Sequence, residues 1–65
     1  MPMIRVEMFE GRTIEQKRRF AEAVTAAFVE NCGGTAQSVQ VIFNDVARAN
    51  WATAGNLNVE TKTQS

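Results

Sequence analysis

The chain has no histidine and only one cysteine, Cys32, among its 65 residues. A single cysteine cannot form an internal disulfide, and without histidine the usual zinc and iron ligand sets cannot be assembled. We therefore expect no metal site, and no other cofactor is implied. Cys32 is better explained as a small packing residue than as a nucleophile, because no histidine is present to activate its thiol.

The chain also lacks an excess of charge of one sign and any long apolar run. Seven basic and seven acidic residues cancel, so the basic surface of a dedicated nucleic-acid binder is missing. No stretch approaches the ~20 apolar residues of a membrane span, and the N-terminus lacks the apolar segment of a signal peptide. We therefore expect a cytoplasmic protein that binds neither nucleic acid nor membrane.

The short chain limits how much stability its own core can provide. A protein of this size buries only about 60% of the surface that its unfolded chain exposes, which leaves a lone core marginal. Since disulfides and metals are excluded, association with further subunits is the remaining source of stability. We expect one domain, residues 1–65, that forms an oligomer.

The spacing of apolar residues predicts a strand followed by a helix. Residues 3–9 alternate between apolar and polar positions, as in a half-buried strand. Thr13 and Gln16 have the spacing of a capping box, which predicts the start of a helix, and Gly33 is a typical residue for its end. One apolar stripe at helical spacing runs between them. The stripe consists of Phe20, Ala21, Val24, Ala27 and Phe28.

The charged residues of this helix are interpreted as a solvated face. Glu15 and Arg19 form a favourable i,i+4 pair, worth a few tenths of a kcal/mol. Lys17, Arg18 and Arg19 are therefore not expected to bind a ligand. Glu22 extends the same charged face.

A second strand is predicted over residues 39–46, where one face is apolar and Ile42 makes the other face partly apolar. Strand, helix and strand with short joints form a βαβ unit with parallel strands and a right-handed crossover. Two strands do not make a stable sheet, so the unit must pair its edge with a second copy. The predicted fold class is α/β, with dimers that share a four-stranded sheet covered by helices on one face.

The tail is predicted to contain a short hairpin. Gly55 and Asn56 form a plausible turn, and Leu57 and Val59 have the spacing of a short strand. Residues 60–65 are polar and are expected to fray.

Pro2, directly behind Met1 at the head of the first strand, is the candidate catalytic residue. If Met1 is cleaved, the proline nitrogen becomes a free secondary amine, a base whose pKa can be moved toward neutrality by burial and nearby cations. If Met1 is retained, the nitrogen is an inert amide and the methionine lies where a substrate would bind. The alternative is a structural proline, because proline is well tolerated at the first residue of a strand.

Four features occur together in this sequence: Pro2 behind Met1, the run EGRTIEQK at 10–17, the run SVQVI at 38–42, and Asn50-Trp51. In this combination the chain resembles the short-chain members of the 4-oxalocrotonate tautomerase family over nearly its whole length. The resemblance implies a hexamer, built as a trimer of βαβ dimers. It also implies that the amino-terminal proline is the general base in keto-enol tautomerisation of 2-hydroxydienoates and related small 2-oxo acids.

Arg12 is the candidate ligand for the substrate carboxylate. Its guanidinium offers a planar fork of donors that fits a carboxylate, and the resemblance favours this role over a loop arginine that pairs with a neighbouring acid. Pro2 and Arg12 lie at opposite ends of the first strand, more than ~20 Å apart along an extended chain. A site that contains both must draw Arg12 from a neighbouring subunit.

Trp51 and Gln40 are the remaining candidate site residues. Trp51 is either an interface anchor that buries ~150–250 Å² or the aromatic residue that makes the site apolar in this family, and the two roles are compatible. Tautomerases that act on dicarboxylate dienols carry a second arginine where this chain has Gln40. Gln40 donates one hydrogen bond without charge, which costs on the order of 2–4 kcal/mol of transition-state stabilisation. The candidates to supply the missing positive charge are Arg5, Arg48 and a partner chain.

The sequence favours a tautomerase with altered or low efficiency, acting on a small 2-oxo or 2-hydroxy unsaturated acid. Three alternatives remain open. One is a hydratase or dehalogenase in which the same proline activates water. The other two are a non-enzymatic assembly module and a subunit of a hetero-oligomer whose other chain supplies the missing arginine.

Overall fold

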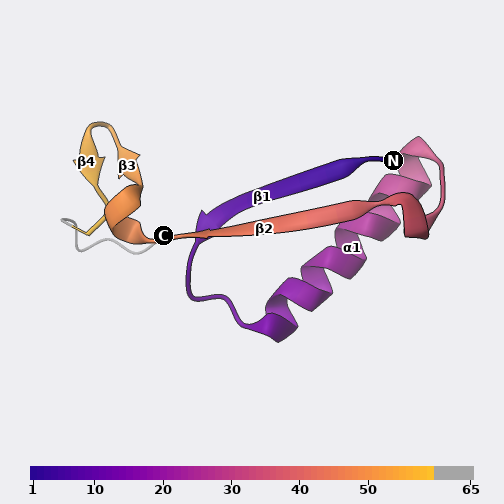
Figure 1. Ribbon diagram of the computed structural model, residues 1–65, viewed down its shortest axis with the longest axis horizontal. Helices are drawn as coiled ribbons and strands as arrows, with labels where there is room; N and C mark the ends of the chain where they lie inside the picture. The colour runs from indigo at the N-terminus through magenta and orange to yellow at the C-terminus, as the bar shows by residue number, and fades with distance from the viewer. Residues whose placement is uncertain (60–65) are drawn as a thin grey trace.

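The computed structural model describes residues 1–59 and shows a βαβ unit followed by a small hairpin (Figure 1). The elements in chain order are β1 (Met3–Phe9), α1 (Ile14–Cys32), the 3₁₀ turn η1 (Ala36–Ser38), β2 (Gln40–Val46), the 3₁₀ turn η2 (Arg48–Asn50), β3 (Ala52–Thr53) and β4 (Asn56–Leu57). The α/β class and the βαβ order predicted from the sequence are confirmed.

Strands β1 and β2 pair in parallel, from Met3 opposite Gln40 to Phe9 opposite Val46. The first strand has the predicted bounds. The second begins one residue later than predicted, because the backbone N–H of Val39 donates to the carbonyl of Ala36 at 3.2 Å and closes η1 instead.

Helix α1 begins with the predicted capping box. The backbone N–H of Gln16 donates to Thr13 Oγ1 at 3.1 Å, and the N–H of Thr13 donates to Gln16 Oε1 at 2.8 Å. These two bonds satisfy donors that have no partner within the helix. At the other end Gly33 has φ of 88°, and its N–H donates to the carbonyl of Val29. Both predicted ends of the helix are confirmed.

The apolar stripe of α1 faces the sheet only in part. Phe20 makes an edge-to-face contact with Phe43 of β2, with ring centroids 6.1 Å apart, yet Phe20 remains 47% exposed. Ala27 is exposed, and the half-buried positions of the helix include Val29, which the predicted stripe left out. The reason is that α1 crosses the strands obliquely, so that its N-terminal end extends past the sheet (Figure 1).

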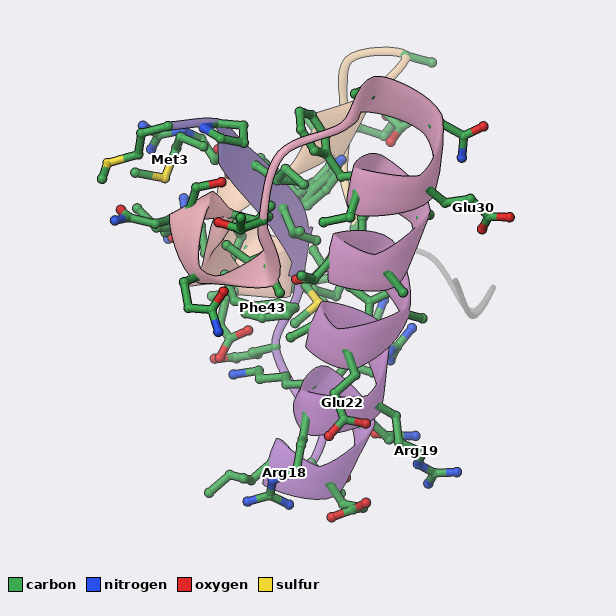
Figure 2. All side chains as sticks on the ribbon, turned by 90° about the vertical axis from the view of Figure 1, so that its right-hand side faces the viewer. Met3, Arg18, Arg19, Glu22, Glu30 and Phe43 are labelled. Atoms are coloured by element: carbon green, nitrogen blue, oxygen red, sulfur yellow. The ribbon has the colours of Figure 1, made fainter. Side chains whose placement is uncertain are left out.

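The charged residues of α1 are divided between two faces. Arg18, Arg19, Glu22 and Glu30 project from the sides of α1 that do not contact the strands, as expected for a solvated face (Figure 2).

The assignment of Lys17 to the solvated face is wrong. Its Nζ lies 2.6 Å from Asp45 Oδ2 of β2, and its side chain is 26% exposed. The long aliphatic stem of lysine lets the ammonium group reach the sheet while it stays in contact with water. On the solvated face Glu15 pairs with Arg18 and, at 3.8 Å, with Arg19 as predicted.

Strands β3 and β4 form an antiparallel hairpin beyond the far end of the main sheet (Figure 1). Its two-residue turn is Ala54-Gly55, with φ of 56° and 82°, as a type I′ turn requires. The predicted turn was placed one residue too late, because Asn56 already pairs with Thr53. Val59 lies outside the strand, and the expected fraying of residues 60–65 concerns a segment outside the described residues.

An aromatic contact joins the hairpin segment to the main sheet. The ring of Trp51 lies 4.6 Å from that of Phe9, the last residue of β1, and the Arg48 guanidinium lies 4.4 Å from the centre of the Phe9 ring. The carbonyl of Trp51 accepts the backbone N–H of Asn58 at 3.0 Å, which closes the base of the hairpin.

Within residues 1–59 no side chain is buried in the single chain. The radius of gyration is 14.9 Å, whereas a compact domain of this length has about 11 Å. Large apolar side chains are exposed on β1, α1, β2 and β4 and at both ends of the described residues. They are Met1, Met3, Ile14, Phe20, Ile42, Leu57 and Val59.

We therefore expect the folded protein to be an oligomer, because a two-stranded sheet without a buried core cannot offset the entropy of ordering the chain. Its denaturation midpoint should rise with protein concentration. Sedimentation velocity and urea denaturation over a dilution series test this. A monomer that stays folded, with the same midpoint at every concentration, would contradict it.

We also expect Phe9→Ala to loosen the hairpin, because an aromatic pair is worth about 0.5–1.5 kcal/mol beyond the area that it buries. Trp51 is the only tryptophan, so the fluorescence of the protein reports on the surroundings of this residue. Quenching by acrylamide should increase in Phe9→Ala and stay unchanged in the control Phe20→Ala. Equal quenching in the two variants would show that Phe9 does not hold Trp51.

Candidate functional site

The predicted site residues lie at two opposite ends of the main sheet. Pro2 and Gln40 are neighbours at one end, where the backbone N–H of Gln40 donates to the Pro2 carbonyl at 3.0 Å. Arg12 and Trp51 belong to the other end, past the last residues of β1 and β2. The seven residues of β1 span roughly 23 Å. One chain therefore brings Pro2 and Gln40 together and keeps Arg12 away from both.

The Pro2 end is covered by the first residue of the chain. Met1 is 89% exposed, and its Sδ lies 3.5 Å from Nε2 of Gln40. In this state the Pro2 nitrogen is an amide without basic character. Loss of Met1 would create the secondary amine at Pro2 and free the Gln40 amide in one step, because Met1 is bonded to the Pro2 nitrogen and contacts the Gln40 amide.

Arg12 follows Gly11 in the loop between β1 and α1, and its side chain is exposed. It makes no hydrogen bond and no ion pair with the residues described, 1–59. It lies at the rim of a cavity of about 230 Å³ between the sheet and the first half of α1. The cavity is lined by Val6, Met8, Arg12, Gln16, Lys17, Phe20 and Phe43.

The electrostatics of this cavity depend on its two cations. Lys17 is neutralised by Asp45 at 2.6 Å, so Arg12 is the cation at the rim that has no counter-charge among the described residues. A guanidinium in this state can accept a carboxylate without breaking an existing ion pair. Apolar side chains line the cavity beside it, and such surroundings strengthen an ionic contact when a ligand displaces water.

Trp51 is half-buried against Phe9, at the same end of the sheet as Arg12. Phe9 itself was missed as a contributor to this end. The available signal was its position in β1, because Phe9 places an aromatic ring on the face that otherwise carries Arg5 and Glu7.

The described residues, 1–59, contain no group of three or more histidine, cysteine, aspartate or glutamate side chains placed to hold a metal ion. None of the helices in this part of the chain has the length and apolar composition of a membrane span.

Comparison with known proteins shows the family to which this chain belongs. Residues 2–60 match the family model of the tautomerase enzymes. A probable tautomerase of Streptococcus pneumoniae is 40% identical over 60 residues, which are 92% of this chain and 100% of the relative. The 2-hydroxymuconate tautomerase of Comamonas testosteroni is 44% identical over 55 residues, 85% of this chain and 87% of that enzyme.

Solved structures of the same family have the same fold. The chain is similar to YwhB, a homologue of 4-oxalocrotonate tautomerase, with a TM-score of 0.90, 34% identity and coverage of 94% of this chain and 100% of YwhB. It is similar at a TM-score of 0.89 and 31% identity to a heterohexameric 4-oxalocrotonate tautomerase from Chloroflexus aurantiacus, with coverage of 95% and 100%. From its matching family model and these relatives, the chain belongs to the tautomerase enzyme family.

Proposed function

We propose that this chain is a keto-enol tautomerase in which Pro2, freed by removal of Met1, is the general base. Its substrate is a small 2-oxo or 2-hydroxy unsaturated acid. The observation that carries the proposal is the placement of Pro2 and Arg12. Pro2 lies at one end of β1, and Arg12, which has no partner among the described residues, lies past the other end of a chain that buries no side chain by itself. Membership of the tautomerase family supports the reaction class.

The site forms between chains, because β1 separates Pro2 from Arg12 by roughly 23 Å within one chain. Pairing of strand edges gives a dimer with a four-stranded sheet, and three such dimers give a hexamer. A second chain places its Arg12 and Trp51 beside the Pro2 of the first. The solved heterohexameric relative supports an assembly of six chains.

The reaction needs one base and no cofactor. The Pro2 nitrogen takes the proton of the 2-hydroxyl group as the enol collapses to the 2-oxo form, and the same nitrogen returns a proton to a carbon of the conjugated chain. The double bond shifts and the atoms balance without oxidation or reduction. Arg12 of the neighbouring chain holds the carboxylate, and Trp51 limits access of water.

Gln40 sets the efficiency of this site. It lies next to Pro2, and its amide donates one hydrogen bond to the substrate oxygen on which charge develops. A neutral amide stabilises this charge less than a cation does, because charge-assisted hydrogen bonds are about twice as strong as neutral ones. The expected result is a tautomerase with altered specificity or a low rate.

A hetero-oligomer is the second candidate, favoured by the heterohexameric relative. In that case a different chain of the same fold supplies part of the charge at the site, and this chain alone assembles but is inactive. Activity of the purified chain by itself separates the two candidates.

We expect Pro2→Ala to lose most of the tautomerase activity, because it keeps an amine at the N-terminus but changes its basicity and shape. Turnover of 2-hydroxymuconate and phenylenolpyruvate measures the loss, after intact mass has shown that Met1 is absent from both proteins. Glu30→Gln, on the solvated side of α1, is the matched control and should retain the activity. Unchanged turnover in Pro2→Ala would exclude the proline mechanism.

A further inference from the structure

The face of the main sheet opposite α1, here called the open face, carries alternate residues of both strands. Met3 points away from α1, whereas Phe43 lies between β2 and the helix (Figure 2). Side chains alternate along a strand, so the register of β1 and β2 fixes the remaining members. The open face consists of Met3, Arg5, Glu7 and Phe9 from β1 and Gln40, Ile42, Asn44 and Val46 from β2.

Arg5 lies near the Pro2 end of the open face. It is paired in register with Ile42, one step along the sheet from the pair Met3 and Gln40. With strands about 4.8 Å apart and a rise of about 3.3 Å per residue, the Cα atoms of Arg5 and Gln40 are roughly 8 Å apart. The long arginine side chain spans much of this distance, so its guanidinium can reach the space in front of Gln40.

Arg5 is exposed and makes no hydrogen bond or ion pair with the described residues. The cations of helix α1, by contrast, form ion pairs: Lys17 with Asp45, and Arg18 and Arg19 with Glu15. Arg48 lies over the ring of Phe9, at the far end of the sheet. Arg5 and Arg12 are thus the two arginines without a partner in the described part of the chain.

The acidic neighbour of Arg5 on the open face does not neutralise it. Glu7 accepts a hydrogen bond from Nδ2 of Asn44 at 2.8 Å, which turns its carboxylate toward β2. The Pro2 end of the open face therefore has an uncompensated positive charge beside a neutral amide donor, Gln40. A carboxylate bound there would gain a charge-assisted contact without displacing an existing one.

We propose that Arg5 is the specificity-determining residue that binds a second carboxylate of the substrate. This rests on the proposed function of Pro2 and narrows it to dicarboxylic acids: Arg12 of a neighbouring chain holds one carboxylate and Arg5 holds the other. Arg48 does not take this role: a neighbouring chain would bring it toward Pro2 together with Arg12 and Trp51, but its guanidinium is already engaged over the ring of Phe9.

The test compares a dicarboxylate, 2-hydroxymuconate, with a monocarboxylate, phenylenolpyruvate, in wild type and Arg5→Gln. Arg5→Gln should lower kcat/KM for the dicarboxylate by about 10-fold or more, the worth of one charge-assisted hydrogen bond, and change the monocarboxylate value by less than about 2-fold. Arg18→Gln removes an arginine from the solvated face of α1 and should leave both values unchanged.

A rescue variant adds a readout that a structural role would not give. Gln40→Arg should raise kcat/KM for the dicarboxylate more in the Arg5→Gln background than in wild type, because the new guanidinium then replaces the missing charge. The proposal would be overturned if Gln40→Arg raised kcat/KM equally in the two backgrounds. It would also be overturned if Arg5→Gln lowered kcat/KM equally for the two substrates. Dissociation of the Arg5→Gln assembly in sedimentation would overturn it as well, since Arg5 would then be an interface residue.

A binding measurement separates this proposal from that of the proline base. Calorimetric titration of wild type and Arg5→Gln with 2-oxoadipate, a dicarboxylate, and 2-oxohexanoate, a monocarboxylate, needs no turnover. If wild type turns over neither 2-hydroxymuconate nor phenylenolpyruvate, the proposed function fails. Even then, a selective loss of 2-oxoadipate binding in Arg5→Gln supports Arg5 as the ligand of the second carboxylate. Equal binding of 2-oxoadipate to both proteins overturns it.

Discussion

The structure depends on one constraint: a single parallel strand pair crossed by one helix cannot enclose a core. Within residues 1–59 no side chain is buried, and the chain is far more extended than a compact domain of its length. Exposed apolar residues on α1, on the open face and on the hairpin are the surfaces that further copies must cover to stabilise the fold. Folding and assembly are therefore coupled in this protein.

The same constraint divides the chemistry between chains. β1 separates the proposed base, Pro2, from the proposed carboxylate ligand, Arg12, by roughly 23 Å, so a site that uses both needs two chains. Assembly then determines activity as well as stability. The two arginines that lack partners among the described residues, Arg5 and Arg12, lie toward opposite ends of the sheet.

Much of the fold was predictable because local signals in this sequence are strong. The alternation in β1 and the capping box of Thr13 and Gln16 fixed the first strand and the start of the helix. The errors arose where tertiary contacts decide the outcome. Lys17 was assigned to the solvated face, but an ion pair with Asp45 across the helix–sheet junction holds it at the sheet, and no local pattern reveals that contact.

The candidate site could be predicted as a set of residues but not as a geometry. The sequence identified Pro2, Arg12, Gln40 and Trp51, and the strand length already placed Pro2 and Arg12 apart. It could not choose between Arg5 and Arg48 as the compensating cation. The proposal of Arg5 needed the register of the sheet and the contact of Arg48 with Phe9.

The most direct test of a site shared between chains is complementation by co-expression of Pro2→Ala and Arg12→Gln, each of which should lose most of its activity alone. In randomly mixed oligomers about one site in four combines an intact Pro2 with an intact Arg12, and activity should return to about a quarter of wild type. A mixed assembly no more active than either variant would show that both residues act within one chain.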